Sequence, residues 1–142
     1  NDFHGEKFSH AAAMRRAGDI IGLNNIYQFG IRSGTEEEFS MNKHLFRFSA
    51  FPHLKKIIEK IPDPIYVTID VDVVDPSQIP AVATPEPNGI TIKELIDSLL
   101  LLKNRKIIGA DIVEYNPLAT SPYASGSAVA VILRELILVM TA

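Results

Sequence analysis

The sequence of 142 residues contains no cysteine. This absence excludes a disulfide framework, thiolate metal ligands and a cysteine nucleophile, and it suits the reducing cytoplasm in which we expect the protein. An excess of positive charge is also lacking, because the formal net charge is −3, so we expect no nucleic-acid partner. No apolar run approaches the roughly 18–20 residues of a membrane span, and the first residues are too polar for a signal peptide. We therefore expect no membrane partner.

An initiating methionine is lacking as well. The chain opens with Asn1-Asp2-Phe3-His4, as expected of a truncated or processed product. Its length fits one domain or a large piece of one. We expect residues 1–142 to be a portion of a single domain.

Short apolar segments alternate with segments of helical pattern along the whole chain. Strands are expected at residues 25–31, 44–48, 65–71 and 106–113, and helices at residues 9–17, 54–61, 91–102 and 121–140. The pairs Thr35/Glu38 and Thr91/Glu94 have the spacing of capping boxes, and each predicts a helix start. Helices between buried strands predict parallel βαβ units and a layered α/β fold.

Two acids stand at the end of the most apolar expected strand, residues 65–71, which should be buried on both faces. Residues two apart in a strand share a face, so Asp70 and Asp72 should project together, about 6.5 Å apart along the backbone. Uncompensated carboxylates beside a buried strand cost several kcal/mol, and residues 62–89 contain no lysine or arginine. A divalent metal ion is therefore a candidate counter-charge. Solvated acids that cap a turn are the alternative, and we interpret Asp75 in this way.

The sequence around these acids has further regular features. From Thr68 to Ala81 it reads Thr-Ile-Asp-Val-Asp-Val-Val-Asp-Pro-Ser-Gln-Ile-Pro-Ala, and Gly89 follows. This run resembles the aspartate signature of the ureohydrolase family, which includes arginases and agmatinases, and every spacing matches. The chain departs from the usual pattern in having Ala81, Ala83 and Asn88 where glycines are common.

The resemblance implies a three-layer α-β-α domain with a mainly parallel sheet, of which this chain is the C-terminal half. It also implies a site with two Mn²⁺ ions, in which Asp70 bridges both ions and Asp72 binds one. The other four ligands would come from the missing N-terminal half. Carboxylate and imidazole ligands suit Mn²⁺ better than metals that prefer thiolate.

Two other segments are similar to the same family. Residues 109–117 resemble a later strand that ends in a glutamate facing the guanidinium group of the substrate, a role that would fall to Glu114; a solvated strand-end acid is the alternative. Residues 5–11 are similar to an agmatinase segment whose histidine moves protons, and His10 matches it; an ordinary surface histidine is the alternative. Residues 30–33, Gly-Ile-Arg-Ser, are similar to a family strand end. The remaining histidines, His4, His44 and His53, are expected at the surface.

The function implied by the resemblance is hydrolysis of agmatine to putrescine and urea, a reaction of polyamine biosynthesis, by a hydroxide that two Mn²⁺ ions activate. Arginine or another guanidino compound remains open as the substrate, and a homo-oligomer is expected. One alternative is a haloacid-dehalogenase-like phosphohydrolase with Asp70 as nucleophile. Another is a non-catalytic fragment that folds only with a partner. We expect the chain to be unstable or inactive without its missing half, because parallel strands cut from their sheet leave an open edge.

Overall fold

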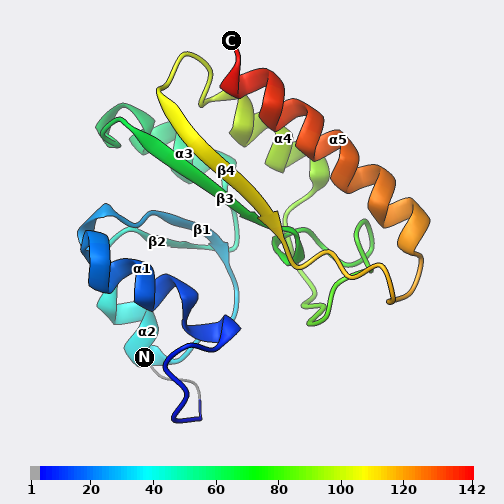
Figure 1. The fold of residues 1–142 in the computed structure, drawn as a ribbon, viewed down its shortest axis with the longest axis horizontal. Coiled ribbons are helices and arrows are strands. Elements are labelled where there is room, and N and C mark those ends of the chain that lie inside the picture. The colour runs from blue at the N-terminus through cyan, green and yellow to red at the C-terminus, as the bar shows by residue number, and fades with distance from the viewer. Residues whose placement is uncertain (1–3) are drawn as a thin grey trace.

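The structure is a computed structural model that describes residues 4–142, and it has two lobes (Figure 1). The first lobe contains 3₁₀ helix η1 (His10–Ala12), α1 (Ala13–Ile21), η2 (Leu23–Asn25), β1 (Gln28–Ile31), α2 (Glu36–Met41) and β2 (Leu45–Arg47). The second contains α3 (Phe51–Ile57), η3 (Ile58–Lys60), β3 (Ile65–Asp70), η4 (Val71–Val73), α4 (Ile92–Leu100), β4 (Ile107–Val113) and α5 (Pro122–Met140).

The strands form two parallel pairs. In the described part of the chain β1 pairs with β2, and β3 pairs with β4. Helix α2 connects the first pair and α4 lies in the connection of the second, so each pair is a βαβ unit. The prediction of a parallel α/β architecture is confirmed. A single sheet that joins the two pairs is not found within residues 4–142.

The hydrophobic core lies on one face of the β3–β4 pair. Leu54 of α3, Leu99 of α4 and Leu136 of α5 are buried in one cluster with Ile69 of β3. On the opposite face Tyr66 is 58% exposed. The prediction that this strand is buried on both faces is therefore wrong for this chain, because no described residue covers the second face.

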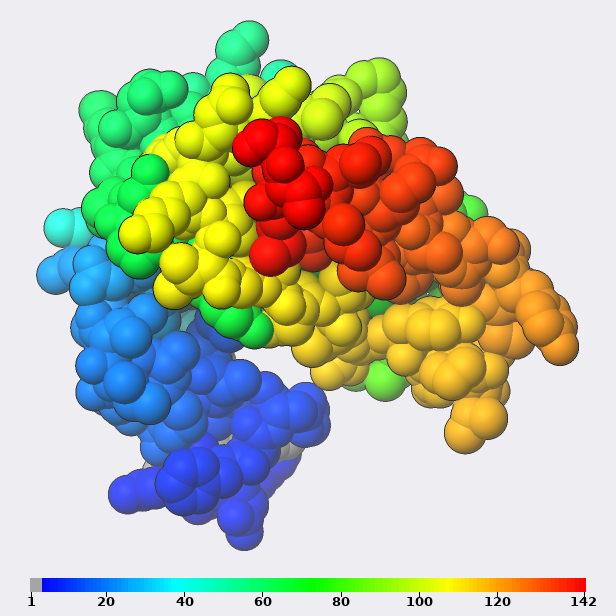
Figure 2. All heavy atoms as spheres, turned by 45° about the horizontal axis from the view of Figure 1, so that its top comes forward, coloured from blue at the N-terminus to red at the C-terminus, as the bar shows by residue number. Residues whose placement is uncertain are grey.

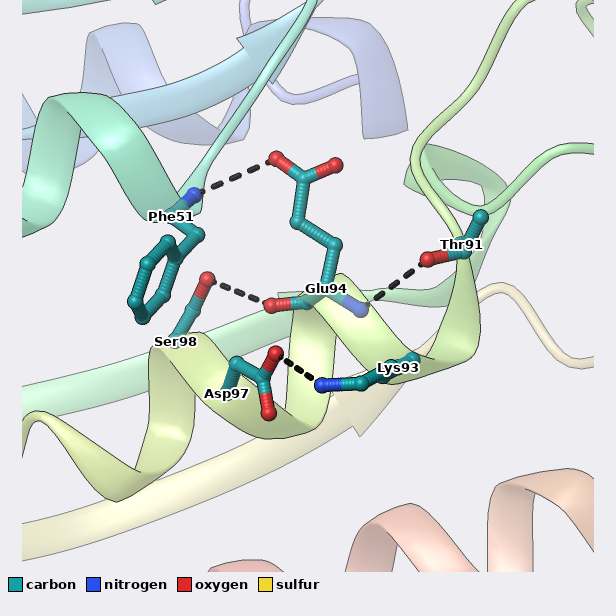
Figure 3. A network of polar contacts seen from close by, with 6 residues as sticks. All are labelled: Phe51, Thr91, Lys93, Glu94, Asp97 and Ser98. Atoms are coloured by element: carbon teal, nitrogen blue, oxygen red, sulfur yellow. Dashed lines mark hydrogen bonds and ion pairs between the residues drawn. The ribbon is translucent and has the colours of Figure 1, made fainter.

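The two predicted capping boxes differ in the structure. At the start of α2 the box is complete, because Thr35 and Glu38 each bond to the other's backbone N–H. At the start of α4 the Thr91 hydroxyl accepts a hydrogen bond from the N–H of Glu94, but the Glu94 carboxylate turns away (Figure 3). It accepts hydrogen bonds from the backbone N–H groups of Ala50 (2.9 Å) and Phe51 (3.3 Å), at the start of α3. The second box is thus replaced by a contact between two helices.

Helix α1 does not end where the sequence predicted. It continues past Gly18 to Ile21, and Gly22 is its C-cap. A Cβ atom on Gly18 would lie 2.5 Å from a methyl carbon of Leu23. Gly18 therefore packs closely against Leu23, and its lack of a side chain does not stop the helix.

Helix α5 is, among the described residues, long and apolar enough to cross a membrane by length and composition. This differs from the expectation drawn from uninterrupted runs, since serines and the charged pair Arg134–Glu135 divide the helix into short runs. Ile132 and Val139 of α5 lie in the hydrophobic core, and Figure 1 shows the helix beside α4. One face of α5 therefore packs on the rest of the described chain, whereas most of the helix is not buried by it.

Candidate metal and substrate site

Three acidic side chains lie at the carboxyl ends of β3 and β4. Asp70 is the last residue of β3, Asp72 lies within η4, and Glu114 follows β4 directly. Because the parallel register pairs Asp70 with Val113, Glu114 leaves its strand next to Asp70. The structure thus places Asp70, Asp72 and Glu114, which the sequence predicted for the site, at the same edge of the strand pair.

The two aspartates are joined by a turn and not by a continuous strand. The sequence predicted strand alternation through Asp72, but β3 ends at Asp70 and η4 begins at Val71. The Asp70 carboxylate accepts a hydrogen bond from the backbone N–H of Asp72 at 3.2 Å and so caps η4. This local bond is the physical reason for the turn. It also keeps the two acids close.

The surroundings of Asp70 disfavour its charge. The pKa of the Asp70 carboxyl is raised to about 7, mainly because neighbouring protein atoms exclude water from it, and next because of the negative charge of Asp72. The N–H of Asp72 acts in the opposite direction, and the charge of Glu114 raises the pKa further. Asp70 keeps an exposed surface, so solvent screens part of this cost. Both charged neighbours are acids, which is the arrangement that a bound cation would relieve.

The loop after η4 folds back over the site. The Thr84 hydroxyl donates a hydrogen bond to the Asp72 carboxylate at 3.1 Å. Asp75 accepts hydrogen bonds from the backbone N–H of Ser77 (3.0 Å) and from that of Gly89 (3.2 Å), so it closes the loop. A Cβ on Gly89 would lie 2.4 Å from the backbone nitrogen of Asp75, so only glycine fits there. The interpretation of Asp75 as a turn-capping acid is confirmed.

Glu114 has an unusual backbone conformation. Its φ is +68°, in the left-handed region that residues with a Cβ rarely adopt. The chain that follows is fixed, because Tyr115 forms a β-bridge with Val82 and its hydroxyl donates a hydrogen bond to the carbonyl of Pro122 (2.8 Å). A left-handed glutamate held between fixed segments is the kind of strained residue that clusters at functional sites.

A groove of about 500 Å³ lies between β4 and α5 and includes Glu114. In Figure 2 the yellow strand and the orange-to-red helix lie side by side at the surface. Apolar residues that line the groove include Ala110, Val113, Val129, Leu133, Ile137 and Met140. In the described chain β4 pairs only with β3, so its second edge is open toward this apolar surface.

His10 is the first residue of η1, in the first lobe, and is exposed. Its role in proton transfer stays a prediction. Of the other histidines, His44 stacks on Tyr27 and His53 on Phe46, so both are only partly at the surface.

The three acids fit a part of a metal site. Their oxygens are ligands of the type that Mn²⁺ accepts, and the two charges that raise the pKa of Asp70, those of Asp72 and Glu114, are both negative. Among residues 4–142, however, no group of three or more histidine, aspartate or glutamate side chains is arranged to hold a metal ion. A complete site would need ligands beyond these.

Comparisons with known proteins agree with this geometry. The arginase-family model matches residues 1–139, and the chain belongs to the arginase family. The agmatinase of Bacillus cereus is 41% identical over 143 residues, which cover 96% of this chain and 49% of that protein. The N(1)-aminopropylagmatine ureohydrolase of Thermococcus kodakarensis is 34% identical over 124 residues, which cover 80% of this chain and 41% of that protein. The crystal structure of a proposed agmatinase from Clostridium difficile has a TM-score of 0.87 and 38% identity, and the match covers 98% of this chain and 53% of that one.

The family match identifies the fold of the chain and the share of its relatives that it spans. The fold is that of an arginase-like α/β domain, and the chain spans about half the length of the curated relatives it matches. The phosphohydrolase alternative is wrong, because the family match extends over nearly the whole chain. The resemblance of three positions to site residues of the family still stands: Asp70, Asp72 and Glu114. The roles of these residues in this chain stay predictions.

Sequence reasoning did not assign two residues that the structure places at the site. Thr84 contacts Asp72 from a loop that lies twelve residues further along the chain. Arg32 contacts the backbone of Asp72 from the end of β1. Thr84 carried no local signal beyond its place in a proline-rich loop. Arg32 lies in the Gly-Ile-Arg-Ser segment that is similar to a family strand end.

Proposed function

We propose that this chain supplies one half of the domain of a metal-dependent hydrolase of guanidino compounds. The observation that carries the proposal is the meeting of Asp70, Asp72 and Glu114 at one edge of a parallel strand pair. Ligands of α/β proteins commonly bind beyond the carboxyl ends of such strands. The charges that act on Asp70 are those of the acids Asp72 and Glu114. A site of this charge suits cations, and both a metal ion and a guanidinium group are cations.

Asp70 and Asp72 would hold the metal ions. They would do so as carboxylate ligands of two Mn²⁺ ions, and the carboxylate of Asp72 accepts a hydrogen bond from the Thr84 hydroxyl that orients it. When bound, two divalent cations lower the pKa of a water molecule so that a nucleophile exists near neutral pH.

Glu114 would bind and orient the substrate. A carboxylate accepts two parallel N–H bonds from a planar guanidinium fork, which fixes the position of the guanidinium carbon. The rigid segment after Glu114 and its left-handed backbone would hold this carboxylate in place. His10 would move a proton to the leaving amine.

We propose agmatine as the substrate, with putrescine and urea as products. The proposal is supported by similarity to an agmatinase at 41% identity and by the Ser9-His10-Ala11 segment. A longer guanidino amine is the second candidate, because the similar protein of Thermococcus kodakarensis is an N(1)-aminopropylagmatine ureohydrolase.

The chain would act together with a complementary half of the domain, and the complete protein would form a homo-oligomer. The open edge of β4 offers unpaired backbone groups, and the apolar groove beside α5 offers a surface for side chains. An extended segment added to such an edge gains both backbone hydrogen bonds and apolar contacts. The half of the relatives that this chain does not match is the proposed occupant.

The test compares two proteins in the presence of Mn²⁺. One is the 142-residue chain alone, and the other is this chain fused behind the segment of the Bacillus cereus agmatinase that precedes the matched region. We expect urea release from agmatine by the fusion and little by the chain alone. Turnover by the chain alone would refute its dependence on a complementary half. A cooperatively folded fusion that releases no urea from any guanidino compound would refute the hydrolase, and one that prefers arginine would refute the agmatine assignment.

A further inference from the structure

We propose that Arg32 is a positioning residue that holds the metal-binding segment around Asp72 in place; this inference rests on the proposed function. Arg32 follows β1 directly. Its guanidinium group donates hydrogen bonds to the carbonyl oxygens of Asp72 (2.7 Å), Val73 (2.8 Å) and Glu86 (3.0 Å). One side chain thus joins β1, the turn η4 and the loop that covers it.

The chemistry of these contacts requires an arginine. The carbonyls of Asp72 and Val73 lie at the end of η4, where the last carbonyl groups of a helix have no partner within the helix. The Val73 carbonyl also accepts the N–H of Ile90 (3.0 Å). A planar guanidinium carries several N–H donors in a fixed fork and can bond to three carbonyls at once, whereas the compact ammonium of lysine cannot span them. The Nε atom of Arg32 is buried and has no hydrogen-bond partner among residues 4–142. The two terminal nitrogens therefore form all three bonds.

The backbone of β1 is shaped so that Arg32 reaches the turn. Gly30 has a φ of +75°, and a Cβ at this position would lie 2.5 Å from a methyl carbon of Val73. The end of β1 therefore packs directly against η4, which no larger residue at position 30 would allow.

Arg32 completes a set of three anchors on Asp72. The N–H of Asp72 is held by the Asp70 carboxylate, its side chain by Thr84, and its carbonyl by Arg32. Through Glu86 the same arginine also holds the loop that carries Thr84. Groups that fix the orientation of a metal ligand in this way typically contribute roughly 10–100-fold to metal affinity.

The experiment uses Arg32→Lys and Arg32→Gln in the complete protein that contains this chain. Arg105→Lys is the matched control, because Arg105 also bonds to backbone carbonyls, those of Ile58 and Ile61, and to the Asp63 carboxylate, in a part of the second lobe away from the acids. Two quantities are measured: the dissociation constant of Mn²⁺ by calorimetry, and hydrogen–deuterium exchange of residues 71–90 without metal.

We expect both Arg32 variants to raise the Mn²⁺ dissociation constant by roughly 10–100-fold and to speed exchange in residues 71–90. The Arg105 variant should speed exchange near residues 58–63 and leave the dissociation constant within about twofold. Equal losses of affinity in both positions, or wild-type affinity in Arg32→Lys, would overturn the positioning role. If the wild type binds no Mn²⁺, the proposed function fails, and unchanged exchange in residues 71–90 would then overturn the role of Arg32 independently.

Discussion

Acidic residues at the helix starts and acidic residues at the strand ends are in opposite situations. At the start of α2, the pKa of Glu38 is lowered, chiefly because its carboxylate accepts a hydrogen bond from the backbone N–H of Thr35. At the end of β3, the pKa of Asp70 is raised to about 7 by loss of water and by the charge of Asp72. Folding therefore favours the ionised form of Glu38 and disfavours the ionised form of Asp70.

This difference separates acids that stabilise the fold from acids that would need a bound cation to offset their cost. An ionised acid bonded to N–H groups stabilises a helix start. An acid whose charge its surroundings disfavour, such as Asp70, and a glutamate at a φ of +68° both cost stability. Such costs at one edge of a strand pair point to a bound cation, and substitutions of both kinds of acid test this contrast.

The largest effect is expected for Asp70→Asn in the complete protein. Asparagine keeps an oxygen that can accept the N–H of Asp72 but removes the charge, so urea release should fall by at least roughly 100-fold. Without metal the variant should unfold at an equal or higher temperature than the wild type at about pH 8. The sign follows from the raised pKa of Asp70, near 7 against a usual 3.8: the folded chain holds the proton more tightly, so stability falls as the pH rises between these values.

Asp75→Asn is the matched control for that prediction. The pKa of Asp75 is lowered, first by the hydroxyl of Ser77 and then by its backbone N–H. Removing this charge should therefore lower the unfolding temperature under the same conditions. The contrast between the two acids would be lost if Asp70→Asn destabilised the metal-free protein as Asp75→Asn does. It would also be lost if Asp70→Asn kept wild-type turnover.

Much of the fold was predictable because its signals are local. The apolar run before Asp70 and the run before Glu114 are β3 and β4, each within a residue or two of the predicted limits. Parallel pairing followed from the helices between the strands. The meeting of the acids at one edge is a consequence of that topology. The spacing around Asp70 and Asp72 also indicated the family.

Other features depend on contacts that no local pattern contains. The turn η4 replaces strand alternation because Asp70 caps it, and a valine-rich sequence gives no sign of such a cap. Glu94 has the spacing of a capping box, but the start of α3 lies close enough to take its carboxylate. The contact of Arg32 with Asp72 joins residues forty positions apart. Distances of that kind are set by packing, and not by sequence spacing.

A smaller effect is expected for Glu94→Ala. The variant removes the acceptor for two N–H groups at the start of α3, so the free energy of unfolding should fall by about 1–2 kcal/mol. Denaturant unfolding of the complete protein measures this loss. Asp97→Ala on the same helix is the control: its partner Lys93 is largely exposed, so the loss should be below about 0.5 kcal/mol (Figure 3). The Mn²⁺ affinity should not change in either variant. A change with Glu94→Ala would contradict the distinction between acids that stabilise the fold and acids that form the site.

The smallest effect is expected for Glu38→Gln, and it should depend on pH. Because the pKa of Glu38 is lowered from 4.5 in the folded chain, its stabilising contribution is present above that value and is lost as the pH falls through the lowered pKa. Glu38 is exposed, so the contribution is only a few tenths of a kcal/mol, roughly. Amide exchange of α2 in the variant relative to the wild type should be faster at about pH 7 and equal at about pH 3. A difference between the two proteins that grows as the pH falls would mean that Glu38 acts on the fold as Asp70 does, and the contrast between the two kinds of acid would not hold.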